Sequence, residues 1–347
     1  MKQLLIGLVA ALAAHASGNA VAAPRCLTEC TPRIGVVSAF GEEAKVLVAQ
    51  TRGAKTFSIN GNRFTIGTLR GNRVVIVLSG VSMINAAMTT QTLLDHFRVS
   101  RLVMSGISGG IDPSHHVGDV IIPESWVMPM EVYWHHDSSL PAPCGSAGDL
   151  SCLGLRIARV DGKPVAPFTL PGGAATGLFM RENHATRPGG PGEGEYVFDY
   201  RADPEMLAVA RRISPALASC GPKAIPAAGA APDPKLCVGT QPRIVVGGRG
   251  VSGTAFLANA AYRTYLFEQL RAQTVDMETA ALAHVAHVNG IPYIAFRSLS
   301  DLAGAQEFNA DVGALFASGL AEANESAVTL AFLAAWAEHD VARRHRR

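Results

Sequence analysis

Three carboxylates stand where segments of regular structure are expected to end. Glu43 follows the apolar run from Arg33 to Ala39, Glu278 follows Val-Asp-Met, and Asp301 follows Arg-Ser-Leu-Ser. Any one of them alone could have a purely structural role, since acidic residues at such places are often helix caps. The carboxyl ends of parallel strands meet at one edge of a sheet, however, so their joint occurrence predicts a shared cleft. One protonated and one ionised carboxyl group would suit general acid–base catalysis.

Two glycine-rich motifs compete with this interpretation. Gly106-Ile107-Ser108-Gly109-Gly110 fits the G-x-S-x-G pattern of serine hydrolases, but that pattern needs a helix directly afterwards, and here Pro113 and a further strand-like run follow. Gly248 to Gly253 fits G-x-G-x-x-G, yet no clean βαβ unit with an acidic residue ending its second strand comes after it. We therefore expect small residues that admit a ligand close to the backbone, with neither a nucleophilic Ser108 nor a bound dinucleotide.

Histidines do not form a recognisable metal motif. His284 and His287 lie three apart on a predicted helix, but no H-E-x-x-H or comparable ligand set accompanies them. Surface or core histidines are the expected roles, and no metal site is predicted. The histidines considered are His115, His116, His135, His136, His184, His284 and His287.

Strands and helices are expected to alternate along the chain. The apolar runs RIGVVSA, FTIGTL, VVIVLSG, RLVMSG and VGDVIIP predict strands, and residues 42–50 and 83–97 have helical spacing. A second series comprises the strand PRIVVGG, a helix over 257–270, the strand TVDM, a helix over 278–288, the strand IPYIAFRSLSD and final helices over 311–341. This order predicts a three-layer α/β/α fold around a central mixed, largely parallel sheet.

The middle of the chain differs in composition. Residues 141–242 are rich in Gly, Pro and Ala, while apolar strands and amphipathic helices recur on both sides. We therefore predict a single domain over 31–342 that carries a long insertion at about 125–240.

The N-terminus predicts export. Lys2 precedes the apolar run LLIGLVAALAA, and Ala20-Val21-Ala22 fits the cleavage rule of signal peptidase, so residues 1–22 are expected to be a signal peptide. No later run is long and apolar enough for a membrane span. A periplasmic or secreted protein without a membrane association after cleavage is expected. The net charge of +2 argues against a general nucleic-acid role.

Six cysteines fall into sequence-local pairs: Cys26 with Cys30, Cys144 with Cys152 and Cys220 with Cys237. In an oxidising compartment such pairs favour three disulfides that staple loops. A metal site is the alternative, but no pair is a C-x-x-C and the pairs lie far apart in the sequence.

The motifs together resemble a known family. IGVVSAFGEEAKVL, LSGVSMINAA, SGISGGIDPSHHVGDVIIP, SGTAFL and VDMETAALAHVAHVNGIPYIAFRSLSD occur in the order found in the methylthioadenosine/S-adenosylhomocysteine nucleosidases of the nucleoside phosphorylase superfamily. Among these motifs, VDMETAALA and RSLSD are the most specific for this family. The resemblance implies cleavage of the bond between a purine and its ribose, with a nucleoside substrate, no metal or organic cofactor, and a dimer or larger homo-oligomer.

The resemblance also assigns roles. Asp301 matches the acid that protonates N7 of the purine, and Glu43 matches the carboxylate that deprotonates the attacking water. Glu278 matches the residue that holds the ribose hydroxyls, with Met277 against the sugar. The other matched positions are Phe256, which stacks on the base, Leu257 beside it, and Gly109, whose backbone approaches the ligand. Asp301 needs a raised pKa, which burial or a nearby carboxylate would give, and the neighbouring Arg297 and Ser300 could tune that pKa.

Water is the expected acceptor of the sugar. Phosphorylases of this superfamily hold phosphate with arginines, whereas the corresponding stretches here, AFGEEAK and MSGISGG, contain none. A carboxylate such as Glu43 repels phosphate. A phosphorylase and an exported storage-like protein without turnover remain alternatives. The chain also departs from the family pattern at Ile107, where a small residue is usual, at Thr254, which replaces an acidic residue, and in its insertion.

Overall fold

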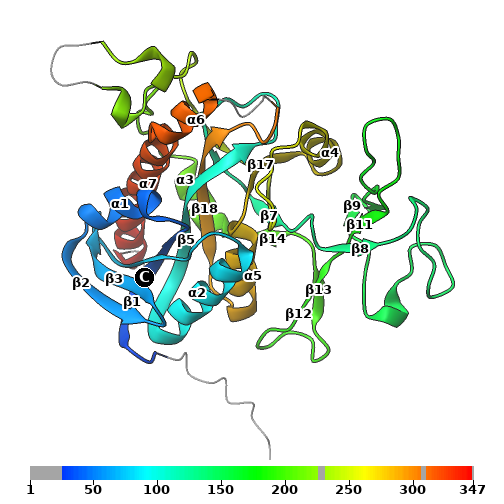
Figure 1. Ribbon diagram of the computed structural model, residues 1–347. Coiled ribbons are helices and arrows are strands. Elements are labelled where there is room, and N and C mark those ends of the chain that lie inside the picture. Colours follow the sequence, from blue (N-terminus) through cyan, green and yellow to red (C-terminus); the bar gives the residue numbers. More distant parts are fainter. Residues whose placement is uncertain (1–25, 226–230, 306–309, 346–347) are drawn as a thin grey trace, which may run out of the picture.

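The computed structural model describes residues 26–225, 231–305 and 310–345 (Figure 1). The predicted signal peptide, residues 1–22, lies outside these ranges. Among the helices of the described ranges, none is both long and apolar enough to cross a bilayer.

The centre of the sheet consists of parallel strands. β1 (Glu29–Ser38) lies between β4 (Asn72–Leu78) and β5 (Phe97–Gly110). β18 (Tyr293–Asp301) pairs in parallel with the other edge of β5. Their Val-, Ile- and Leu-rich sequences suit strands covered on both faces, and β18 is buried along its whole length. Parallel pairing brings the ends of β1, β5 and β18 to the same edge.

Antiparallel strands complete a mixed sheet. β17 (Ala272–Asp276) pairs antiparallel with the end of β5. β3 (Asn62–Leu69) lies between β4 and β2 (Arg52–Ile59) and pairs antiparallel with each of them. The remaining strands of this sheet are β6 (Val120–Ile122), β7 (Ser125–Val127), β14 (Tyr200–Arg201), β15 (Ile244–Val246) and β16 (Arg249–Ser252). The predicted fold class is confirmed, although β2 had not been anticipated.

Helices cover both faces of this sheet (Figure 1). α1 (Gly41–Ala49) and α3 (Pro204–Ala210) pack against α7 (Leu320–His345), while α2 (Met83–His96) packs against α5 (Thr279–Asn289). Side chains of both groups enter one apolar core with the central strands, including Leu47, Leu93 and Phe332. The other helices are α4 (Ala260–Leu270) and α6 (Ala310–Ala317).

The predicted insertion at about 125–240 is interrupted by parts of the core. β7 pairs with β14 and with β16, so β7 and β14 belong to the main sheet. α3 packs on α7 and therefore also belongs to the core. Two excursions therefore leave the core, residues 128–199 and residues 211–243. The first carries the short pairs β8 (Val132–Trp134) with β11 (Leu178–Met180), β9 (Arg159–Val160) with β10 (Lys163–Pro164), and β12 (Asn183–Ala185) with β13 (Glu195–Val197).

Short 3₁₀ turns supply the rest of the regular structure in these excursions, at η1 (Ser151–Leu153), η2 (Pro222–Ala224) and η3 (Pro234–Leu236). Figure 1 shows β8, β9, β11, β12 and β13 extending to one side of the sheet, away from α1 and α7. The two excursions overlap the stretch rich in Gly, Pro and Ala, and the chain returns to the sheet between them at β14.

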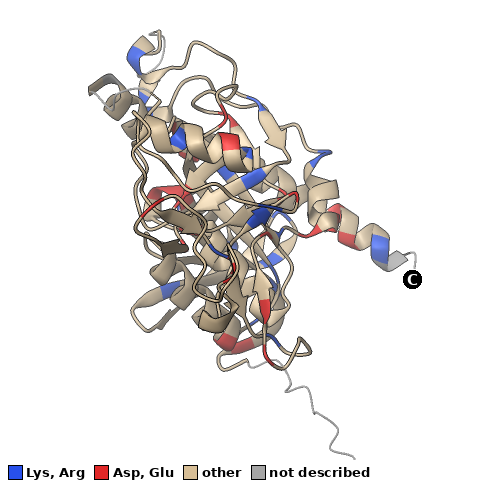
Figure 2. Cartoon of the chain, turned by 90° about the vertical axis from the view of Figure 1, so that its right-hand side faces the viewer, with Lys and Arg blue, Asp and Glu red and all other residues tan. Residues whose placement is uncertain are grey.

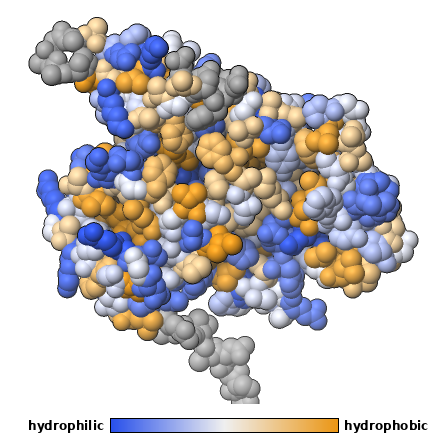
Figure 3. All heavy atoms as spheres, in the orientation of Figure 1, coloured by the Kyte–Doolittle hydropathy of each residue, from blue (hydrophilic) through white to orange (hydrophobic). Residues whose placement is uncertain are grey.

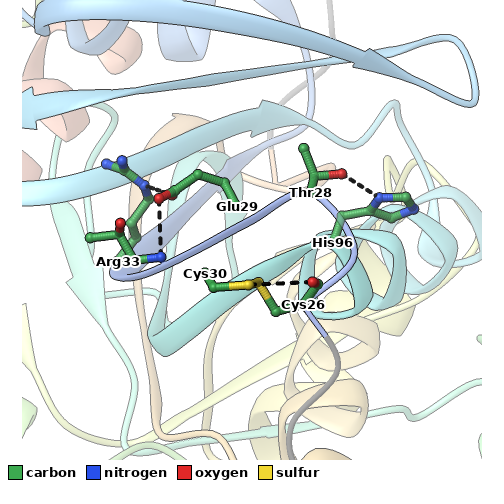
Figure 4. The surroundings of a disulfide bond; sticks show 7 residues. Cys26, Thr28, Glu29, Cys30, Arg33 and His96 are labelled. Atoms are coloured by element: carbon green, nitrogen blue, oxygen red, sulfur yellow. Dashed lines mark hydrogen bonds and ion pairs between the residues drawn. A yellow bond between two sulfur atoms is a disulfide. The ribbon is translucent and has the colours of Figure 1, made fainter.

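All three predicted disulfides form. Cys26 bonds to Cys30, Cys144 to Cys152, and Cys220 to Cys237. Figure 4 shows the first of them at the start of β1, beside the hydrogen bond between Thr28 and His96 and the Arg33–Glu29 ion pair. The Thr28–His96 bond, together with the backbone bonds from Leu27 to Asp95 and from Thr28 to His96, fastens the beginning of the described chain to the end of α2.

Charged residues of both signs are interspersed along the chain in Figure 2. No long run of one sign occurs on the face seen there, as the small net charge of +2 leads one to expect.

Candidate active site

A cavity of about 210 Å³ opens where β1, β5, β17 and β18 end. Most of its lining comes from the ends of these strands, as expected where the carboxyl ends of strands meet at one edge of a sheet. The predicted site residues that line it are Glu43, Ile107, Gly109, Phe256, Leu257, Met277, Glu278, Ser300 and Asp301. Arg297 is the predicted site residue that does not line it.

Glu43 is held rigidly at the start of α1 and is 1% exposed. Its Oε2 accepts hydrogen bonds from the backbone N–H of Ala39 at 2.6 Å and of Phe40 at 3.2 Å. Its Oε1 accepts from the N–H of Ile107 at 2.8 Å. Burial raises the pKa of Glu43 to about 7, against the lowering effect of Arg297 and these N–H donors. The carboxyl group is thus poised to exchange a proton near neutral pH.

Glu278 lies at the N-terminus of α5 and connects two elements. Its Oε1 accepts from the N–H of Ser82 at 2.8 Å, and its Oε2 lies 3.4 Å from Nη2 of Arg297. Burial raises the pKa of Glu278, opposed by Arg297. Ser82 has φ 89° and ψ 153°, a conformation that glycine favours. Such strain costs on the order of 1–3 kcal/mol and is common where a backbone N–H must face a functional group.

Arg297 stands behind these carboxylates and is fully buried. Its Nε lies 2.7 Å from Oδ2 of Asp276, and its Nη1 lies 3.6 Å from Oε1 of Glu43 and donates to the carbonyl oxygen of Ile107. Burial works to lower the pKa of Arg297, but Asp276, Glu43 and Glu278 outweigh it and raise the pKa. The guanidinium therefore orients the carboxylates from behind and does not face the cavity.

Asp301 ends β18 and is 7% exposed. Its Oδ1 accepts from the N–H of Ala303 at 2.8 Å. The hydroxyl of Ser300 donates to Oδ2 of Asp301 at 2.9 Å and also lies 3.2 Å from the carbonyl oxygen of Ser108. Burial raises the pKa of Asp301, opposed by the two hydrogen bonds. Ser300 thus contacts Asp301, whereas Arg297 pairs with other carboxylates.

Apolar groups form the rest of the wall. Phe256 and Leu257 come from the loop before α4, Met277 precedes Glu278, and Phe256 is 60% exposed at the rim. Three further residues line the cavity: Phe40 and Val81, which lie in quoted motifs but receive no role from the sequence, and Phe316 on α6, which lies in none of them. Flat aromatic and sulfur-containing side chains beside carboxylates suit a ligand with a planar ring and a polar sugar.

Asp276 is a further residue that sequence reasoning had not singled out, although it lies in the quoted VDMET motif. Its carboxylate accepts from the backbone N–H groups of Glu278 and Thr279 and from the hydroxyl of Ser252, besides pairing with Arg297. It fixes the start of α5 and thereby the position of Glu278.

The two glycine-rich motifs have structural explanations. Ser108 lies within β5, is buried, and accepts a hydrogen bond from the Thr274 hydroxyl at 2.6 Å, so it does not stand on a strand-to-helix turn. Residues 249–252 of the second motif form β16. A Cβ on Gly250 would lie 2.6 Å from the indole of Trp126, which accounts for glycine there.

Histidines have partners of other kinds. His284 Nδ1 lies 2.7 Å from the Tyr200 hydroxyl, and His287 Nε2 lies 2.9 Å from Glu195. In the described part of the chain, one group has ligand atoms close enough to hold a metal ion, namely His135, His136 and Asp137. It lies on the first excursion, in residues that do not line the carboxylate cavity.

The sequence profile of the phosphorylase superfamily matches residues 33–334. The chain belongs to the phosphorylase superfamily. Its relatives in this superfamily include the 5′-methylthioadenosine/S-adenosylhomocysteine nucleosidases of Bacillus cereus and Bacillus thuringiensis. Each is 28% identical over 277 residues, which cover 78% of this chain and 87% of the relative. The resemblance seen in the motifs is thereby confirmed.

Solved structures of the superfamily share the fold. The Streptococcus pneumoniae 5′-methylthioadenosine/S-adenosylhomocysteine nucleosidase, solved with the transition-state inhibitor MT-ImmA, has a TM-score of 0.55 and 22% identity, covering 88% of this chain and 100% of that one. The futalosine hydrolase of Helicobacter pylori has a TM-score of 0.55 and 16% identity, covering 90% and 98%.

Gly106 is required by the approach of two charged groups. A Cβ at this position would collide with the Arg297 guanidinium and the Glu43 carboxylate. We expect Gly106→Ala to displace Glu43 and to lower kcat/KM for nucleoside cleavage by about 100-fold, since a shift of about 1 Å can cost that much. Gly239→Ala, where an added Cβ meets nothing within 4 Å, is the matched control and should keep full activity. Full activity of Gly106→Ala would show that the position of Glu43 is unimportant.

The Cys220–Cys237 disulfide closes a loop that braces α6. Within it, Lys223 donates through Nζ to the carbonyl oxygen of Ala317 at 2.7 Å and through its backbone N–H to that of Ser318. Because α6 carries Phe316 into the cavity, we expect the double variant Cys220→Ser/Cys237→Ser to raise KM for the nucleoside more than it lowers kcat. It should also lower stability by about 3 kcal/mol.

The control is the double variant Cys144→Ser/Cys152→Ser, which opens a loop of the first excursion. It should reduce the melting temperature while leaving KM unchanged. Equal KM values for both double variants would contradict the proposed bracing of α6.

Proposed function

We propose that this chain hydrolyses the N-ribosidic bond of a purine nucleoside, of the 5′-methylthioadenosine/S-adenosylhomocysteine kind or related to it, giving free base and sugar. One observation carries the proposal: Asp301, Glu43 and Glu278 line a single cavity, and the pKa of each is raised. The curated relatives named above are nucleosidases, which supports the same reaction class.

Asp301 is the general acid. Cleavage of the bond places negative charge on the departing purine, and a proton delivered to N7 neutralises it. A carboxylic acid serves at neutral pH only if its pKa is raised, and burial supplies this for Asp301. Ser300 and the N–H of Ala303 hold the group in place.

Glu43 is the general base. Positive charge develops on the sugar as the base leaves, and water activated by a carboxylate captures it, as in inverting glycosidases. With a pKa of about 7, Glu43 is partly ionised at neutral pH and able to accept a proton. Its three backbone donors fix its direction towards one side of the cavity.

Glu278 and Met277 bind the sugar, and Phe256 and Leu257 contact the base. A carboxylate held by Ser82 and Arg297 has lone pairs left for two neighbouring hydroxyl groups. Phe256 offers a ring face for stacking. Gly109 allows close approach because it lacks a side chain, and a Cβ there would lie 3.1 Å from Oδ1 of Asp301.

Water is favoured over phosphate by the charge of the cavity. Its walls, as far as the described residues form them, contain Glu43, Asp276, Glu278 and Asp301 and neither lysine nor arginine. Arg297 is fully buried behind the carboxylates, with its charge engaged by them. A phosphate dianion would meet repulsion in such a place.

The setting of the reaction is proposed to be the periplasm or the exterior of the cell, with residues 1–22 removed on export. The three disulfides support an oxidising compartment.

We also propose a homo-oligomer, dimer or larger. Apolar residues are exposed among polar ones on the face seen in Figure 3, and Val81, Ile84 and Met88 near the start of α2 are 48%, 69% and 65% exposed.

The reaction is tested by incubating the purified protein with a panel of purine nucleosides, with and without phosphate. We expect free base and free sugar at the same rate in both conditions. Base release that depends on phosphate would identify a phosphorylase. Stabilisation by a nucleoside without any product would identify a binding or storage protein, and either result would overturn the proposed hydrolysis.

A further inference from the structure

A second cavity, of about 350 Å³, adjoins the candidate active site. Its walls come from the first excursion and from α4, and they include Met130, Val132, Phe168, Leu178, Tyr262 and Tyr265. Lys, Arg, Asp, Glu and His are all absent from the described residues that line it. The cavity is larger than the one that holds the carboxylates, and the reaction proposed above does not use it.

Leu257 connects the two cavities, because its side chain lines both. The chain that follows it lies against the turn after Asp301: the N–H of Asn259 donates to the carbonyl oxygen of Ala303 at 3.3 Å. The N–H of Ala303 in turn donates to Asp301. The second cavity is therefore reached from the end of the active site where the acid meets the purine.

The chemistry of the walls selects an uncharged ligand. Phe168 lies edge-on to Tyr262 with ring centroids 5.1 Å apart, and Tyr265 is 5.3 Å from Phe168. The Tyr265 hydroxyl donates to the carbonyl oxygen of Ala166, and burial raises the pKa of Tyr262 to about 12, which keeps it neutral. Edge and face contacts of this kind suit an aromatic or branched apolar group.

The volume of the second cavity also suits an uncharged aromatic or branched apolar group. An apolar cavity of about 150 Å³ is enough to bind benzene, so this one accommodates a benzyl or prenyl group with its linking atoms. Few polar groups are available to hold ordered water, so an apolar group that fills the space gains contacts without displacing strongly bound solvent.

We propose that the second cavity receives an apolar substituent on the purine of the substrate, carried at the ring edge remote from the ribose, so that N6-substituted adenine nucleosides are preferred. This inference rests on the proposed function, since the orientation of the purine follows from Asp301 as its acid. The preferred substituent is of benzyl or prenyl size. A substituent of this size that leaves water should raise kcat/KM by about 10- to 100-fold.

The test compares 5′-methylthioadenosine with its N6-benzyl derivative on the full chain after signal removal. The native protein should hydrolyse the N6-benzyl compound about 10-fold or more faster in kcat/KM. Leu178→Trp fills the cavity and should abolish this preference while leaving 5′-methylthioadenosine unaffected. Leu153→Trp, on an exposed residue of the same excursion, is the matched control and should keep the preference.

Val132→Phe fills the same space and replaces Leu178→Trp if that variant does not fold. Equal rates for the two nucleosides on the native protein, or a preference that survives filling, would overturn the inference. If neither compound releases base, the proposed hydrolysis has failed, and the affinities of the two compounds are then compared by calorimetry. Tighter binding of the N6-benzyl compound, lost in Leu178→Trp, would support the proposed role of the second cavity. Equal affinities would overturn that role.

Discussion

Asp301→Asn is expected to lower kcat/KM for nucleoside hydrolysis by about 100- to 10,000-fold, because asparagine keeps the shape of the side chain but has no acidic proton to deliver to the purine. The amide oxygen can still accept from the N–H of Ala303, so the fold should persist. The measurement is base release under saturating and limiting nucleoside, together with the melting temperature of the variant.

Asp161→Asn is the control for this substitution, since Asp161 is exposed on a turn with φ 49°, a conformation that asparagine tolerates. It should retain native activity. If Asp301→Asn were as active as this control, the acid would have to be another group. A folded but inactive Asp301→Asn that still binds a nucleoside would agree with the proposed role.

Glu43→Gln is expected to cause a similar loss of kcat/KM, about 100- to 10,000-fold, because the amide cannot take a proton from water. Some stability is also lost. Both oxygens of Glu43 accept backbone N–H groups, and the amide nitrogen of glutamine would face one of these donors, at a cost of about 1–3 kcal/mol. Glu42→Gln, on the exposed neighbour, should change neither activity nor stability appreciably.

The pH profile separates the two roles. Glu43 must be ionised to act as base, so kcat/KM of the native protein should rise with pH through about 7 as its carboxyl group deprotonates. Asp301 must be protonated, so activity should fall once the pH exceeds the raised pKa of its carboxyl group. In Glu43→Gln the rising limb should disappear from the residual activity. A rising limb that persists near pH 7 would assign that ionisation to a different group.

Much of the site could be predicted because strand ends and local motifs contain the necessary information. Glu43, Glu278 and Asp301 each lie at the end of a strand whose apolar run is visible in the sequence. Parallel pairing with β5 brings the ends of β1 and β18 together, and β17 meets the same end of β5 in antiparallel pairing. The cysteine pairs were equally accessible, since partners at short separation need no knowledge of the fold.

Other features depend on tertiary packing and left no local signal. Arg297 lies four residues before Asp301 in the same strand, and a regular pleat would turn both side chains to the same face. The register shift between Leu299 and Asp301 interrupts that pleat, and the ion pair with Asp276 holds the guanidinium behind the cavity. Phe316 reaches the cavity from α6, which Lys223 of the disulfide-closed loop contacts at Ala317. The return of the chain to the sheet at β14 depends on pairing with β7 over two residues, too short a run for periodicity to detect.

The most direct test of a common role for the three carboxylates is the crystal structure of Asp301→Asn with 5′-methylthioadenosine bound. The proposed function predicts that the introduced asparagine lies beside N7 of the purine, that Glu278 contacts the ribose hydroxyls, and that a water molecule lies between Glu43 and the anomeric carbon. A nucleoside bound elsewhere, or one bound with its sugar turned away from Glu43 and Glu278, would contradict it.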